Sequence, residues 1–291
     1  MRTAGVVEAA DGTPIAFHTH GASRGPVVLL TNGIGTTENF WRFLVADLSV
    51  DHTVVHWDYR GHGHTPTAAS RDYRLRTHAD DLGRVTRRVM ERDGRPPVHL
   101  AFSMGVAVLL ELYRSQPELV RAMGLIAGAP DAPGTGVGLF RLPGASAAVR
   151  TAAALATPVV PLVAPLVKLF LRSRLPYPVA LAAGVLQPGA ARADIDQFLA
   201  GVAAMDPLAY WHTLRGLLGA QGSDVLPRVS VPVHLIAASK DRLMPAAQLE
   251  AMRRALPHAT FTRIDDAGHA GLVEKGPEMA RAVRQLLSSL R

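Results

Sequence analysis

Short apolar segments alternate with amphipathic ones along most of the chain, and no other feature constrains the fold as strongly. Segments with the length and composition of buried strands lie at 26–31, 53–58, 97–102, 122–128 and 231–239. Helical patterns accompany them at 38–47, 75–92, 103–115, 246–256 and 277–290. Strands that are apolar on both faces are typical of parallel sheets with helices on either side. The sequence therefore predicts a doubly wound α/β sheet.

Two further segments extend this sheet at its edges. Residues 6–9 and 14–20 flank Asp11 and Gly12, a favoured turn pair, so we expect a β-hairpin there. Residues 259–265 are half polar, which predicts an edge strand.

The alternation of strands and helices stops between about 131 and 225, where Ala, Leu, Val and Pro dominate. We expect an α/β core of residues 1–130 and 226–291, with residues 131–225 inserted as a helical cap. Within the cap, residues 151–167 carry no charge, which is near the lower length limit for a membrane span. Three prolines interrupt this segment, so we interpret it as a kinked apolar cap over a pocket rather than as a membrane contact.

Composition argues against several classes of protein. The chain has no cysteine, which excludes disulfides, a thiol nucleophile and a cysteine-based metal site. The formal net charge is +7, but the arginines are scattered and aromatic residues make up 5% of the chain, so we do not expect nucleic-acid binding. The first residues lack the apolar core of a signal peptide, which favours a cytoplasmic location.

One serine lies where a predicted strand meets a predicted helix. Ser103 follows strand 97–102 in the sequence Ala101-Phe102-Ser103-Met104-Gly105. A sharp strand-to-helix turn would expose the hydroxyl and crowd the backbone two residues away on either side. Ala101 and Gly105 are small enough, and the pattern is G-x-S-x-G with alanine at the first glycine. The alternative is an ordinary helix N-cap, although residue 106 is valine and offers no capping box.

A base and an acid follow in the order typical of a Ser-Asp-His arrangement. His269 lies in a glycine-containing loop before the last helix, and Asp241 comes directly after the apolar segment 231–239. Asp131 is the other candidate acid. Asp241 could also be a turn residue paired with a neighbouring cation.

The oxyanion of an acyl-transfer reaction needs two backbone N–H donors. We expect one from Met104, directly after the serine, and the other from Ile34 in the loop after strand 26–31. Gly33 and Gly35 flank Ile34 and let that backbone approach a substrate.

Five motifs together give the chain a resemblance to the α/β-hydrolase superfamily over nearly its whole length. They are NGIG (32–35), WDYRGHGHT (57–65), AFSMG (101–105), SKDRLMP (239–245) and AGHAG (267–271). The first motif lacks the His-Gly pair common at that position, and its Asn32 is similar to the Asn-containing loop of enol-lactone hydrolases. The DYRGHG sequence looks like a structural turn beside the active site.

The resemblance implies a fold and a mechanism. The fold is the α/β-hydrolase fold, a mostly parallel sheet with an inserted helical cap. His269 would remove the Ser103 proton, Ser103 would attack an ester-type carbonyl, and Asp241 would orient the imidazole. Water would then release the acyl group, and neither a cofactor nor a metal is needed.

Other candidate sites are weaker. Gly33 and Gly35 with Asp58 form an incomplete dinucleotide fingerprint, because residue 38 is glutamate. His62 and His64 have no evident partners for a metal. We interpret Asp80 and Asp81, adjacent on a predicted helix, as solvated charges. The aromatic residues Trp41 and Trp211 are candidate substrate contacts, although core packing is the commoner role.

We therefore expect a serine hydrolase that acts on a small hydrophobic ester or lactone. The alternatives are acyl transfer or perhydrolysis by the same three side chains, and a non-catalytic protein that binds a hydrophobic ligand. The sequence carries no signal for the oligomeric state.

Overall fold

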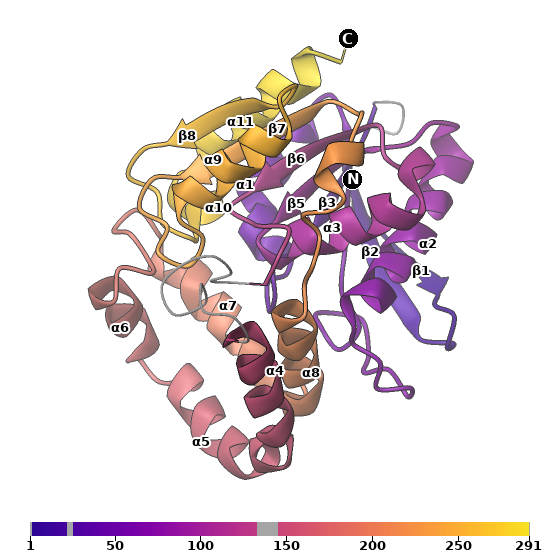
Figure 1. Cartoon of the computed structure of the whole chain (residues 1–291). Helices are drawn as coiled ribbons and strands as arrows, with labels where there is room; N and C mark the ends of the chain where they lie inside the picture. The colour runs from indigo at the N-terminus through magenta and orange to yellow at the C-terminus, as the bar shows by residue number, and fades with distance from the viewer. Residues whose placement is uncertain (1, 22–25, 133–144, 291) are drawn as a thin grey trace.

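An eight-stranded sheet forms the centre of the molecule in the computed structural model, which describes residues 2–21, 26–132 and 145–290 (Figure 1). The strand order is β1-β2-β4-β3-β5-β6-β7-β8. The strands are β1 (Arg2–Glu8), β2 (Pro14–Gly21), β3 (Val27–Thr31), β4 (Thr53–Trp57), β5 (Val98–Phe102), β6 (Ala122–Ile126), β7 (Val233–Ala238) and β8 (Thr260–Ile264). The first two pair antiparallel as the expected hairpin, β2 pairs antiparallel with β4, and the remaining pairs are parallel.

Helices cover both faces of this sheet, as the apolar strands require. Every residue of β3, β4, β5, β6 and β7 is buried. On one face pack α2 (Leu75–Asp93), α3 (Met104–Ser115) and α9 (Ala246–Ala255). On the other face pack α1 (Arg42–Leu48), α10 (Gly271–Glu274) and α11 (Gly276–Ser288). Half-exposed β8 lies at the sheet edge, which confirms the prediction made from its polar residues.

The chain between β6 and β7 is helical where it is described. Its helices are α4 (Ala145–Leu155), the 3₁₀ turn η4 (Thr157–Val159), α5 (Val160–Arg172), α6 (Pro176–Ala182), α7 (Arg192–Ala204) and α8 (Pro207–Leu218). Figure 1 shows this group at one end of the sheet, apart from the helices that cover its faces. We propose that residues 131–225 form a cap on the core; residues 133–144 of that span lie outside the described structure.

The proline-rich segment 151–167 is helical, but it is divided into two α-helices. The turn η4 separates α4 from α5, whereas Pro165 lies inside α5. By length and composition alone, Ala147–Arg172 is long and apolar enough to cross a membrane, which is weak evidence by itself.

A buried ion pair fixes the loop after β4. The guanidinium of Arg60 donates two hydrogen bonds to Asp81, both of 2.8 Å, and a third to Asp11, also of 2.8 Å. The interpretation of Asp81 as a solvated charge was therefore wrong, since α2 turns this carboxylate toward the loop and buries it; its neighbour Asp80 is exposed. The Arg60 contacts connect the hairpin, the loop and α2.

Candidate active site

Ser103 occupies a strained turn between β5 and α3. Its φ of 53° and ψ of −119° lie outside the regions that residues with a Cβ prefer. The Ser103 N–H donates to the carbonyl of Ile126 at 2.9 Å, which ties the turn to the next strand. Ser103 stands at the N-cap position, but its side chain makes no capping hydrogen bond. The hydroxyl is therefore available for another partner.

The residues around this turn must be small because neighbouring backbone atoms occupy the space of a side chain. A Cβ on Gly105 would lie 2.6 Å from the Thr31 carbonyl oxygen and 2.8 Å from that of Asn32. A Cβ on Gly128 would lie 2.5 Å from the Ser103 carbonyl oxygen. In contrast, Ala101 is buried inside β5, so the first position of the motif accommodates a methyl group.

Three side chains that are far apart in the sequence meet at the carboxyl edge of the sheet. Nε2 of His269 lies 3.0 Å from the Ser103 hydroxyl, and its Nδ1 lies 2.7 Å from Oδ2 of Asp241. Oδ1 of buried Asp241 accepts hydrogen bonds from the N–H groups of Leu243 and Met244, at 2.9 and 2.8 Å. A carboxylate held in this way favours the imidazole tautomer with its proton on Nδ1, which leaves Nε2 to accept the serine proton.

Asp131, the other candidate acid, lies elsewhere. Its Oδ1 accepts hydrogen bonds from the N–H groups of Gly222 at 2.9 Å and Ser223 at 3.1 Å. These bonds secure the chain between α8 and β7, so Asp131 is not the partner of His269.

The two expected oxyanion donors lie near Ser103. Met104 is the first residue of α3, so its N–H has no acceptor within the helix. A Cβ on Gly33 would lie 3.1 Å from the Ser103 Cβ, which shows how closely the loop before Ile34 approaches the serine. The Asn32 side chain instead bonds Trp41 and the Trp57 carbonyl, at 2.8 and 3.0 Å, and belongs to the core.

A mostly apolar cavity of about 240 Å³ opens beside the serine and histidine. The sheet side contributes Ile34, Phe40 and Phe102. The chain between β6 and β7 contributes Pro176, Ala180, Leu186, Ile195, Phe198, Leu199 and Tyr210. Burial raises the pKa of the Tyr210 hydroxyl, so this group stays neutral. No residue of 151–167 lines this cavity; among the described residues between β6 and β7, its lining comes from α6 to α8 and the segment between α6 and α7.

Neither tryptophan proposed as a substrate contact lines the cavity. Trp41 is fully buried behind Phe102, because its indole N–H is bonded to Asn32 in the core. The Trp211 indole N–H points to Thr157 of η4, at 3.2 Å, and holds α8 against that turn. The neighbouring Tyr210 faces the cavity instead. Which of two adjacent aromatic residues faces inward depends on the helix orientation, which the sequence does not specify.

Glu274, which was not among the residues predicted for the site, supports the histidine loop. Its buried carboxylate accepts hydrogen bonds from the N–H of Gly268, next to His269, and from the N–H of Gln187, the latter at 2.9 Å. Burial raises the pKa of Glu274, although the two N–H donors oppose that shift. The carboxylate thus joins the histidine loop to the segment between α6 and α7. Its spacing from His269 belongs to no motif that could have marked it.

His64 contacts another histidine and a carboxylate, whereas the nearby His62 contacts neither. Its Nδ1 lies 3.2 Å from both His18 Nε2 and Asp58 Oδ2, and ligand atoms of the three residues all lie within 4.8 Å of one another. His62 bonds the Arg60 carbonyl instead, at 3.1 Å. The expectation that no carboxylate or histidine accompanies His64 was wrong. Hydrogen bonds of the His64 imidazole account for the two 3.2 Å contacts, and we assign no metal to the cluster.

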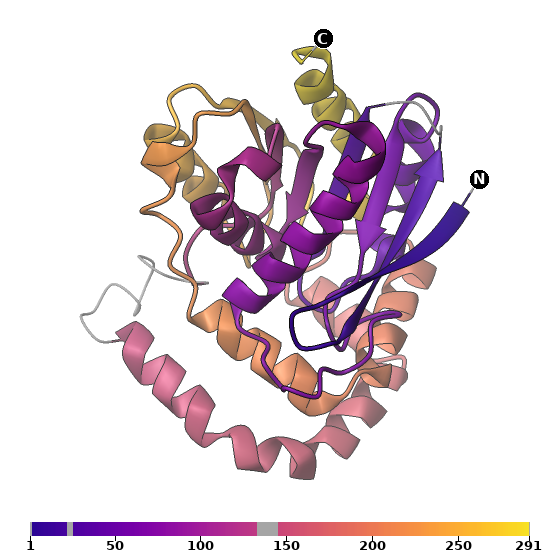
Figure 2. The same cartoon turned by 90° about the vertical axis from the view of Figure 1, so that its right-hand side faces the viewer.

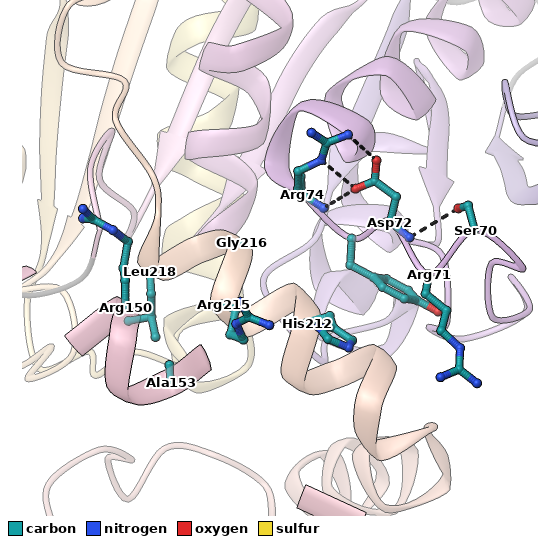
Figure 3. A pocket seen from close by; sticks show the side chains of 11 residues that line it. Ser70, Arg71, Asp72, Arg74, Arg150, Ala153, His212, Arg215, Gly216 and Leu218 are labelled. Atoms are coloured by element: carbon teal, nitrogen blue, oxygen red, sulfur yellow. Dashed lines mark hydrogen bonds and ion pairs between the residues drawn. The ribbon is translucent and has the colours of Figure 1, made fainter. Parts of the chain in front are cut away.

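A larger cavity of about 440 Å³ lies between the loop at 70–74, α4 and α8 (Figure 3). Arg71, Arg74, Arg150 and Arg215 line it, and Figure 3 shows their side chains pointing in different directions. Arg74 pairs with Asp72, and the Ser70 hydroxyl donates to Asp11. Ser70 therefore bonds an aspartate and not a histidine, unlike Ser103, which lies 3.0 Å from His269.

A family model described as the alpha/beta hydrolase fold matches residues 26–276, and the chain belongs to this family. The strand order and the strand-to-helix position of Ser103 agree with this assignment. The resemblance and the fold class predicted from the sequence are thereby confirmed.

Similar proteins include several hydrolases. The chain is 29% identical to the magnesium-chelatase 30 kDa subunit of Rhodobacter capsulatus, over 86% of this chain and 82% of that one. It is 28% identical to the pimeloyl-[acyl-carrier protein] methyl ester esterase of Methylococcus capsulatus, over 92% and 97% of the two chains. The crystal structure of an enol-lactonase from Burkholderia xenovorans superimposes with a TM-score of 0.74 at 18% identity, covering 98% of this chain and 100% of that one. That structural likeness concerns the fold alone.

Proposed function

We propose that the protein is a serine hydrolase that cleaves a carboxylic ester or lactone with a hydrophobic portion. The observation that carries this proposal is the pair of contacts made by His269, 3.0 Å to Ser103 and 2.7 Å to Asp241. One imidazole then accepts a proton from a hydroxyl while a buried carboxylate stabilises its charged form.

The proposed reaction proceeds through an acyl-enzyme. Ser103 Oγ attacks the carbonyl carbon as His269 takes the hydroxyl proton, and the N–H groups of Met104 and Ile34 stabilise the oxyanion. His269 gives the proton to the leaving alkoxide and the carbon–oxygen bond breaks; the alcohol of an ester departs, whereas that of a lactone stays attached to the acyl group. Water, deprotonated by His269, then attacks the acyl carbon. The bond from that carbon to Ser103 Oγ breaks, His269 returns the proton to Oγ, and the acid is released.

The cavity supports a hydrophobic substrate. Its lining consists mainly of apolar side chains, with the polar groups of Ser103 and His269 at one side. The relative from Methylococcus capsulatus is named as a methyl ester esterase, which supports an ester as the substrate class.

Hydrolysis of p-nitrophenyl esters of graded acyl length tests this proposal. We expect Ser103→Ala to lower kcat/KM on the order of 10³-fold or more, because the nucleophile is removed. Ser70→Ala is the matched control and should retain wild-type turnover, since Ser70 bonds Asp11 and not a histidine. Turnover should fall for the longest chains, which exceed the cavity of about 240 Å³. Equal activity of Ser103→Ala and wild type would refute the assignment.

A further inference from the structure

The outermost helices between β6 and β7 carry a row of large apolar side chains exposed to solvent. Leu155, Val159, Leu162, Leu166 and Leu169 follow one another at intervals of four and three residues, the spacing of one helix face. Each of these side chains is between 49% and 77% exposed. We call these five residues the apolar stripe.

The opposite side of the same helices packs against the rest of the protein through small residues. Ala153 and Ala164 are buried, and α4 and α5 pack against α7 and α8. Figure 2 shows α4 and α5 as a curved outer layer on the side of the molecule away from the sheet. A surface helix ordinarily turns its large apolar residues inward and its polar residues outward. The stripe reverses this arrangement, so packing within the described structure does not explain it.

Exposed apolar residues gather on this surface rather than being scattered. Of the thirteen large hydrophobic side chains exposed in the described structure, ten lie between Leu155 and Val179. Beyond the stripe they include Leu175 and Val179, at the start of α6. A contiguous apolar surface of this kind indicates an interaction site, whereas isolated exposed residues do not.

The charged residues in this part of the sequence are all positive, and one of them, Arg192, pairs with Asp196 of α7 at 3.1 Å. Residues 132–193 contain no Asp or Glu, although the whole chain has 24. The same residues include six cations: Arg141, which lies outside the described structure, and Arg150, Lys168, Arg172, Arg174 and Arg192. An apolar helix face flanked by Arg and Lys complements an anionic lipid surface. A second copy of the chain would instead bring like charges together across a two-fold axis.

We propose that the apolar stripe docks on the surface of a bilayer containing anionic lipids. The helices α4 and α5 would lie in the interface with the stripe among the acyl chains and Arg172 and Arg174 at the headgroups. They would not span the bilayer, because their other side remains packed on α7 and α8. Helix α6 presents Val179 outward and Ala180 to the cavity at Ser103, so the docked surface adjoins the site of the proposed function. Docking itself does not depend on catalysis.

Vesicle co-sedimentation of the purified full chain tests this proposal. One set of vesicles contains phosphatidylcholine alone, and the other also contains phosphatidylglycerol. We expect wild type to bind the anionic vesicles preferentially and to be released by salt. Leu162→Gln with Leu166→Gln should weaken binding by about tenfold or more, because two exposed leucines no longer enter the interface. Arg172→Gln with Arg174→Gln should weaken binding to anionic vesicles roughly fivefold per residue.

Val50→Gln is the matched control. Val50 is 79% exposed, like the stripe residues, but lies on the core beyond α1, so this variant should bind as wild type does. All the substituted residues are exposed, and circular dichroism should show each variant folded. Ser103→Ala should also bind normally, which separates docking from the proposed hydrolysis. The proposal is overturned if wild type binds neither kind of vesicle, if Val50→Gln weakens binding as much as the stripe variant, or if the stripe variant only converts a dimer to a monomer.

Discussion

At the scale of single residues, Ser103 has a strained backbone conformation that places its hydroxyl next to His269. Its positive φ places the hydroxyl above the end of β5, within 3.0 Å of His269. A residue with a Cβ in this conformation costs about 1–3 kcal/mol, which the surrounding contacts must offset. The hydrogen bond from Ser103 N–H to Ile126 is one of these contacts.

Replacing Ser103 therefore tests whether the turn is strained. Because glycine tolerates positive φ, we expect Ser103→Gly to be more stable than Ser103→Ala by about 1 kcal/mol, after allowing for the greater unfolded-state entropy of glycine. Urea denaturation of the two inactive variants measures the difference. Equal stability would show that the conformation carries no cost.

At the scale of elements, α3 lies so close to β3 that its second residue must be glycine. The carbonyl oxygens of Thr31 and Asn32 occupy the space that a Cβ on Gly105 would need. This close approach brings the amino end of α3, and with it the Met104 N–H, up to the loop that contains Ile34. The close contact thereby brings the Met104 N–H near the loop that carries the other proposed donor, Ile34.

Gly105→Ala should lower the free energy of unfolding by about 2 kcal/mol or more, because backbone atoms cannot move aside as a flexible side chain can. Activity should fall as well, since relief of the clash displaces Ser103. Gly201→Ala in α7 is the control: nothing lies within 4 Å of its Cβ position, so stability should rise by about 0.5–1 kcal/mol. Similar effects at the two positions, in thermal or urea unfolding, would contradict the steric argument.

The local sequence pattern predicted the helices and strands well, but it predicted poorly which side chains are buried by tertiary contacts. The apolar runs of β3 and β5 and the small residues around Ser103 report on local structure, and the structure places them as predicted. The burial of Asp81 and Trp41 depends on partners, Arg60 and Asn32, that approach only in the folded chain. The segment 151–167 was expected above the pocket because it is apolar, but its large apolar side chains are exposed to solvent and none lines the cavity at Ser103.

At the scale of the whole molecule, histidines buried in the sheet couple stability to pH. Burial lowers the pKa of His56 and of His99 from 6.5 to about 4. Between pH 6.5 and 4 these imidazoles take up a proton in the unfolded chain but stay neutral in the folded core. Protonation therefore favours unfolding, and the free energy of unfolding falls as the pH falls from 6.5 toward 4. Each accounts for about 1.4 kcal/mol of stability lost per pH unit within that window.

His99→Gln should make the loss of stability between pH 6.5 and 4.5 shallower by about 1.4 kcal/mol per pH unit. The glutamine can keep the hydrogen bond that Nε2 of His99 gives to the Leu119 carbonyl, at 3.2 Å. Urea unfolding of the variant and of wild type at several pH values measures the slope. A wild-type slope in His99→Gln would show that this imidazole is not coupled to folding.

If the folded chain makes one hydroxyl nucleophilic, that hydroxyl should react covalently with a serine-directed reagent. The protein would be treated with a fluorophosphonate and the modified peptide located by mass spectrometry. We predict one equivalent of label on Ser103, with labelling slowed on the order of 10³-fold or more in His269→Ala. A folded protein whose Ser103 stays unmodified, or is labelled equally fast without the imidazole, would contradict the account.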